Sequence, residues 1–157
     1  MLHMNESTDS KVFEYDPNVT GTKGLILFSK SLDVAVYRRD NRTDKAPGLV
    51  DVAGGGIEHG ESPFDNFSRE AKEEFGIDIS REMVVYASRH LGIQDPSSVT
   101  WFLGIVAPEE LKSTAKLGNE GAELIIEPYQ TYLNRVDAWD TFQNRSRKFV
   151  EEYLALR

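Results

Sequence analysis

Three glutamates, spaced so that they share one arc of a helix, are the strongest chemical signal in this sequence. They are Glu70, Glu73 and Glu74, and the helix that carries them is expected to begin at Ser62-Pro63 and to end at Gly76. Like charges at this spacing destabilise an isolated helix by about 0.2–0.5 kcal/mol per pair, and partial burial adds a desolvation cost. A hard divalent cation such as Mg²⁺, which prefers oxygen ligands, would offset both costs. The cluster therefore indicates a metal site, although a solvated acidic face is the commoner role of such a cluster.

A glycine run precedes this helix and strengthens the functional interpretation. Gly54 to Gly56 allow the backbone to approach a ligand or a metal closely, and Glu61 lies just before the helix begins. Backbone N–H groups at the start of a helix can also bind phosphate. Arg69 lies four residues before Glu73 and can hold that carboxylate in place. We therefore expect the chemistry to be concentrated between Gly55 and Ile77.

This stretch resembles the Nudix box, GX5EX7REUXEEXGU, in which U is an apolar residue. Every fixed position is matched by Gly55, Glu61 and the run from Arg69 to Ile77, with Ala71 as a small residue at the first U position. Many Nudix proteins carry Trp-x-x-Pro before the paired glycines, whereas this chain has Val50-Asp51-Val52-Ala53. The departure puts the fine geometry of the loop in doubt but leaves the helix intact. The chain is thus similar to the Nudix (MutT-like) hydrolases.

The resemblance implies roles for the residues of the box and for one acidic residue outside it. Glu70, Glu73, Glu74 and the Gly54 carbonyl would hold Mg²⁺, for which Mn²⁺ is a possible substitute. Arg69 would orient the carboxylates, and Glu61 would brace the loop or help to bind the metal. The general base would be Glu70 or a loop glutamate, for which Glu120 is the first candidate and Glu123 the second.

The resemblance also implies a reaction, the hydrolysis of a diphosphate bond in a nucleoside diphosphate linked to a group X. Nucleotide sugars, ADP-ribose and nucleoside triphosphates all remain possible substrates. Gly55 and Gly56 are expected to bind the substrate together with Arg38 and Arg39, which begin a charged loop. Alternatively, this loop is merely solvated. The alternative is a non-catalytic nucleotide-binding sensor on the same scaffold. Isopentenyl diphosphate isomerases share the fold but use a cysteine, which this chain lacks.

Composition narrows the class of protein. The chain has 157 residues, 39% of them hydrophobic, which suits a single domain over residues 11–157 after a flexible N-terminus at 1–10. A formal net charge of −8 argues against a nucleic-acid or anionic-membrane partner, but not against a small phosphorylated substrate held through a metal. No long apolar run or signal peptide is evident, so we expect a cytoplasmic protein. A homodimer is possible but undecided.

Hydrophobic patterning predicts an α+β fold with a mixed sheet sandwiched between helices. Strands are expected at 11–15, 22–29, 33–39, 48–52, 83–93, 99–106 and 123–126. Helices are expected at 62–76, at 128–134 and at 140–156, the last capped by Asp140. Trp101 and Phe102 should point to opposite faces of their strand, where each packs in the core or lines a base pocket.

Overall fold

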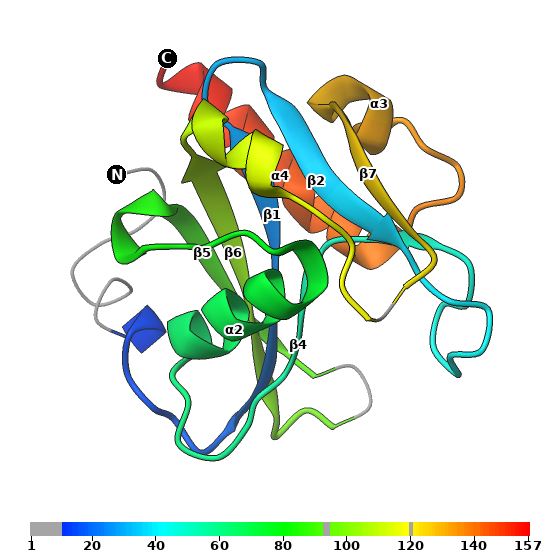
Figure 1. Cartoon of the computed structure of the whole chain (residues 1–157). Coiled ribbons are helices and arrows are strands. Elements are labelled where there is room, and N and C mark those ends of the chain that lie inside the picture. The colour runs from blue at the N-terminus through cyan, green and yellow to red at the C-terminus, as the bar shows by residue number, and fades with distance from the viewer. Residues whose placement is uncertain (1–10, 93–94, 120) are drawn as a thin grey trace.

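The computed structural model describes residues 11–92, 95–119 and 121–157. Within these ranges, seven strands form one mixed sheet (Figure 1). The strands are β1 (Val19–Phe28), β2 (Asp33–Arg38), β3 (Val50–Asp51), β4 (Ala53–Gly56), β5 (Val84–Leu91), β6 (Val99–Ala107) and β7 (Glu123–Pro128). The helices are α2 (Pro63–Phe75), α3 (Tyr129–Leu133) and α4 (Asp140–Ala155), and 3-10 turns lie at Arg81–Met83 and Glu109–Thr114. None of the described helices has the length and apolar character needed to span a membrane.

The sheet is built around β1, which pairs with three other strands. The main order is β3-β2-β1-β6-β5, while β4 also pairs with β1 and β7 with β2. The β1–β6 pair is parallel and the other pairs are antiparallel. In the β1–β4 ladder, Lys23 lies opposite Gly54, and Thr22 lies opposite Gly55. The glycine run is therefore a strand of the sheet, held beside a lysine of β1.

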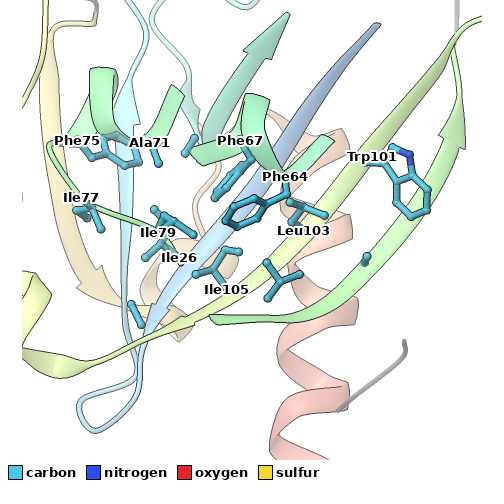
Figure 2. Close-up of a cluster of buried hydrophobic side chains, with 14 of the residues drawn as sticks. Ile26, Phe64, Phe67, Ala71, Phe75, Ile77, Ile79, Trp101, Leu103 and Ile105 are labelled. Atoms are coloured by element: carbon cyan, nitrogen blue, oxygen red, sulfur yellow. The ribbon is translucent and has the colours of Figure 1, made fainter. Parts of the chain in front are cut away.

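Helices cover both faces of the sheet, and alternate residues of β1 supply both cores. Figure 2 shows Phe64 and Phe67 of α2 packed near Leu103 and Ile105 of β6 on one face. On the other face, Phe149 and Val150 of α4 share a cluster with Leu25, Leu27 and Phe102. Trp101 belongs to the first cluster, so the two aromatic residues of β6 point to opposite faces as predicted. The α+β class, with a mixed sheet between helices, is confirmed.

The caps of α2 explain why the sequence located this helix well. Ser62 precedes the helix, and its side-chain oxygen accepts a hydrogen bond from the Asp65 N–H at 3.0 Å. Gly76 ends the helix in the left-handed conformation, with φ of 68°, and its N–H donates to the Lys72 carbonyl. Both ends of the helix are therefore fixed by local chemistry.

Three sequence predictions are corrected at other places. The strand expected at 11–15 is wrong, because Lys11 and Val12 are helical and Val12 is fully buried in the first core. The strand expected at 48–52 is short, and the glycines after it form β4. Trp139, not Asp140, is the residue that precedes α4, and it makes no side-chain cap.

Two further predictions fall partly outside the described residues. The flexible N-terminus at 1–10 lies outside them, and so does the end of the strand predicted to reach residue 93. A domain boundary at residue 11 stays a prediction.

Candidate active site

Glu74 is the carboxylate that α2 buries most deeply against β4. Only 4% of the residue is exposed, and its Oε1 accepts a hydrogen bond from the Gly54 N–H at 2.9 Å. Burial raises the pKa of Glu74 to about 8, the negative charges of Glu70 and Asp51 add to the rise, and Lys23 and the Gly54 N–H oppose it. Glu74 is therefore not part of a solvated acidic face. A cation bound nearby would stabilise the ionised form of its carboxylate.

Glu70 lies one turn earlier on α2 and faces the same strand. A Cβ on Gly55 would lie 2.7 Å from Glu70 Oε1, so the carboxylate packs directly on the glycine backbone. The Glu70 side chain is 14% exposed, intermediate between that of Glu74 and the 59% exposed side chain of Glu73. The three glutamates thus form a gradient from the interior to solvent, as their positions around the helix predict.

Arg69 is surrounded by carboxylates. Its guanidinium lies 2.8 Å from Glu61, 3.1 Å from Glu73 and 3.2 Å from Glu70. It also donates to the Gly56 carbonyl at 3.2 Å, which ties the helix to the end of β4. The predicted pairing with Glu73 is present, and the structure adds pairing with Glu61, which lies just before the helix.

The donor set suits a hard divalent cation. Glu70 and Glu74 present carboxylate oxygens beside β4, and such oxygens are the ligands that Mg²⁺ prefers. Within residues 11–92, 95–119 and 121–157, no three acidic or histidine side chains are gathered closely enough to hold one ion. Glu73 is engaged by Arg69 and would have to leave it to join the other two. The structure thus brings two of the three predicted ligands to one strand, and the role of the Gly54 carbonyl stays a prediction.

A second ionic cluster was missed by the sequence analysis. Asp51 is fully buried, and its Oδ2 lies 2.7 Å from Lys23 Nζ and 3.0 Å from Arg39 Nη1. The Tyr37 hydroxyl accepts a hydrogen bond from Arg39 Nη1 at 3.2 Å. Burial raises the pKa of Tyr37 and the negative charge of Glu74 adds to the rise, so Tyr37 lies between the two clusters. One signal was available, because Asp51 and Lys23 are charged residues inside apolar strand segments and buried charges need partners.

A cleft of about 330 Å³ opens beside these groups. It is lined by Gly55 and Gly56 of β4, by Lys23 and Arg39, and by the aromatic rings of Trp139 and Phe142. We call it the inner cleft.

Trp139 reaches the inner cleft because a bridge joins its segment to β3. The Trp139 N–H donates to the Val50 carbonyl at 2.8 Å, and the Val50 N–H donates to the Asp137 carbonyl at 2.8 Å. The Trp139 ring then lies edge-on to Phe142, with ring centroids 4.9 Å apart. The start of α4 therefore supplies aromatic surface that no sequence pattern had assigned.

The remaining predicted site residues are not all brought to this cleft. Arg39 lines it, whereas Arg38 points elsewhere and pairs with Asp137 at 3.1 Å and with Glu123 at 3.4 Å. The first candidate for the loop glutamate, Glu120, lies outside the described residues.

Comparison with known proteins identifies the family and supports the fold. The NUDIX domain family matches residues 22–153. A MutT/nudix family protein from Listeria innocua aligns over 91% of this chain and 100% of its own, with 18% identity and a TM-score of 0.67. An Ap4A hydrolase from C. elegans aligns over 87% of this chain and 99% of its own, with 16% identity and a TM-score of 0.62.

A bifunctional NMN adenylyltransferase/ADP-ribose pyrophosphatase from Francisella tularensis, solved with AMP and a manganese ion, shares the fold in part of its length. It aligns over 87% of this chain and 42% of its own, with 13% identity and a TM-score of 0.61. A comparison with curated proteins gave no match. The match over residues 22–153, together with the box carboxylates assembled on α2 against β4, establishes that the chain belongs to the NUDIX family and is a Nudix hydrolase.

Proposed function

We propose that the protein hydrolyses, in a Mg²⁺-dependent manner, a diphosphate bond in a nucleoside diphosphate linked to a group X. The observation that carries this proposal is the packing of Glu70 and Glu74 of α2 against β4, whose glycines also line the inner cleft. Carboxylates for a metal and cations for a phosphate thus adjoin the same short strand.

The residues of the site have different roles in this reaction. Glu70, Glu73 and Glu74 would hold Mg²⁺, or Mn²⁺ in its place, through their carboxylate oxygens. When bound, a divalent cation neutralises diphosphate charge and lowers the pKa of water. Arg69 keeps Glu61 and Glu70 in position through its ion pairs.

Two cations and one carboxylate complete the proposed mechanism. Lys23 and Arg39 are fixed by Asp51 at the edge of the inner cleft, where they can bind substrate phosphate. Among the residues that the structure describes, Glu70, beside Gly55, is the candidate for accepting a proton from the attacking water. Glu120 is the alternative. Both stay predictions.

The substrate is proposed only as a chemical class. The Ap4A hydrolase and ADP-ribose pyrophosphatase among the structural neighbours support a small-molecule nucleotide substrate. Nucleotide sugars, ADP-ribose and nucleoside triphosphates remain candidates for this chain. The cytoplasmic location stays a prediction, and the choice between monomer and homodimer is open.

Product analysis by ion-pair chromatography tests the proposal. The purified protein is incubated with nucleoside triphosphates, nucleotide sugars, ADP-ribose and dinucleoside polyphosphates, first with Mg²⁺ or Mn²⁺ and then with chelator. We expect cleavage at a diphosphate bond of at least one compound, and loss of that cleavage with chelator. Cleavage that persists in chelator would contradict the metal-dependent mechanism, and no cleavage of any compound would favour the sensor.

A further inference from the structure

Arg145 on α4 differs from half of the ten arginines of the chain because it has no anionic partner among the residues that the structure describes. Arg38, Arg39, Arg42, Arg69 and Arg135 each form ion pairs with carboxylates. Within the described ranges, Arg145 forms no ion pair and no hydrogen bond through its side chain. Its guanidinium instead lies 5.4 Å from the centre of the Phe142 ring. A partly buried guanidinium without a partner is costly, since Arg is rarely buried unless paired.

Arg145 lines a second cleft, of about 560 Å³, which we call the outer cleft. The two clefts are continuous, because Lys45, Thr100, Trp139 and Phe142 line both. The glycines of β4 line only the inner cleft. The outer cleft is therefore reached from the carboxylates of α2 by way of the inner cleft.

Positive charge is concentrated in the outer cleft of an otherwise acidic chain. The formal net charge of the protein is −8, yet the lining of the outer cleft has more basic than acidic side chains. The basic ones are Lys45 and Arg145. The side chain of Lys45 also has no ion pair with any residue that the structure describes. Asp95 is the acidic residue of the lining, and its Oδ1 accepts hydrogen bonds from the N–H and hydroxyl of Ser97 at 3.0 and 2.6 Å. That carboxylate is held within its own turn, so the two cations remain available to a ligand.

The backbone of Lys45 is tied to the phosphate-binding side of the inner cleft. Arg39 donates from its Nε to the Lys45 carbonyl at 2.9 Å while its Nη1 pairs with Asp51. Lys45 is thus positioned by the same arginine that borders the inner cleft. A ligand that fills the inner cleft and extends past Trp139 would meet Lys45 and Arg145 together.

We propose that the outer cleft binds a phosphate group that the substrate nucleotide carries at a position remote from the scissile diphosphate. The substrate would then be a nucleoside diphosphate derivative with an additional phosphate on its ribose. This inference rests on the proposed function, because it places the nucleotide in the inner cleft. Arg binds phosphate through two parallel hydrogen bonds, and such charge-assisted contacts are stronger than those to a neutral sugar.

Equilibrium binding tests the proposal without any need for turnover. The chain has two tryptophans, and both line the inner cleft, while Trp139 also lines the outer cleft. Tryptophan fluorescence therefore reports on occupancy of the two clefts. The probes are AMP, adenosine 2′,5′-bisphosphate and adenosine 3′,5′-bisphosphate. We expect one bisphosphate to bind about tenfold more tightly than AMP, as a hydrogen bond between charged groups allows. The bisphosphate that gains affinity identifies the position of the phosphate.

Variants of α4 separate this contact from general attraction by positive charge. Arg145→Met keeps the aliphatic stem over Phe142 and should reduce the preference for the bisphosphate to about twofold or less, since it removes the charged partner. Lys148→Met removes one exposed positive charge a turn further along the same helix, and should keep the preference. Lys45→Met provides a second variant if Arg145→Met fails to fold, and it should also lower the preference.

The outcomes of these experiments are distinct. Equal affinity for AMP and both bisphosphates, or an undiminished preference in Arg145→Met, would overturn the inference while leaving the proposed hydrolysis intact. A failure of the proposed function would appear instead in the chromatographic panel, as absence of metal-dependent cleavage.

Discussion

Two ionic clusters adjoin the glycine strand β4, and they are opposite in composition. In one, the cation Arg69 is surrounded by carboxylates that include Glu61, Glu70 and Glu73. In the other, the carboxylate of Asp51 lies between the cations Lys23 and Arg39. The first cluster has an excess of negative charge and suits a metal ion, whereas the second has an excess of positive charge and suits a phosphate.

The clusters also differ in burial, which changes what each contributes to stability. Asp51 is fully buried, whereas the Arg69 side chain is 23% exposed and that of Glu73 59% exposed. Breaking a buried pair leaves an uncompensated charge, while exposed pairs contribute little. We therefore expect the Asp51 cluster to support the fold and the Arg69 cluster to support mainly the reaction. The following variants test that division.

The largest expected effect is on activity, from Glu74→Gln. This variant keeps the shape of the side chain and removes the charge that faces β4, so metal-dependent hydrolysis should fall by about 100-fold or more. The rate of product formation at saturating Mg²⁺ measures the loss, and circular dichroism checks that the fold survives. If the variant kept most of its activity, the assignment of the metal site would be wrong.

The next effect is on stability, from Asp51→Asn. It leaves Lys23 and Arg39 without their buried counter-charge, and the free energy of unfolding should fall by about 3 kcal/mol. Urea denaturation measures the change. Asp137→Asn is the matched control, because Asp137 also lies between two arginines but its side chain is 38% exposed, and it should cost about 1 kcal/mol or less. Equal losses in the two variants would remove the distinction based on burial.

A smaller effect on activity is expected from Arg69→Ala. The change removes a group that positions carboxylates rather than a metal ligand, so activity should fall by about 10-fold, less than in Glu74→Gln. Arg135→Ala is the control and should keep its activity. The Arg135 side chain is 21% exposed and also pairs with two carboxylates, but these lie far from α2 in the sequence. Full activity in Arg69→Ala would show that the carboxylates hold their positions without it.

The most gradual effect is a dependence of stability on pH in the metal-free protein. The pKa of Glu74 rises from 4.5 to about 8 on folding because the side chain is buried. The folded protein therefore binds a proton that the unfolded chain releases, and stability should decrease as the pH rises from about 4.5 to about 8. Urea denaturation in chelator over this range should show the decrease in the wild type and a weaker one in Glu74→Gln. Identical profiles for the two proteins would mean that Glu74 does not titrate in this range.

The sequence was most informative where the relevant spacing is local. The rotation of a helix fixes which side Glu70, Glu73 and Glu74 occupy, so their gradient of burial followed from their positions alone. Ser62 and Gly76 likewise act on neighbouring backbone groups. The motif, the helix and the Arg69–Glu73 pair could therefore be predicted without knowledge of the fold.

The sequence was least informative where distant segments meet. Patterning favoured a strand at 11–15, but Val12 is buried against the core and Phe13 packs on Phe64, with ring centroids 5.3 Å apart. Both contacts join the start of the chain to residues of the later core. Tertiary packing of this kind overrides weak local propensity.

The sequence by itself determined the carboxylate side of the site, because its glycines and glutamates lie on one helix, on the strand before it and in the short loop that joins them. Only the tertiary structure decided the substrate side. Lys23 meets Asp51 across 28 residues, and Trp139 reaches the cleft through a bridge to β3. Such contacts depend on the order of strands in the sheet and on where α4 begins, and these are fixed by burial of the whole chain rather than by any local spacing.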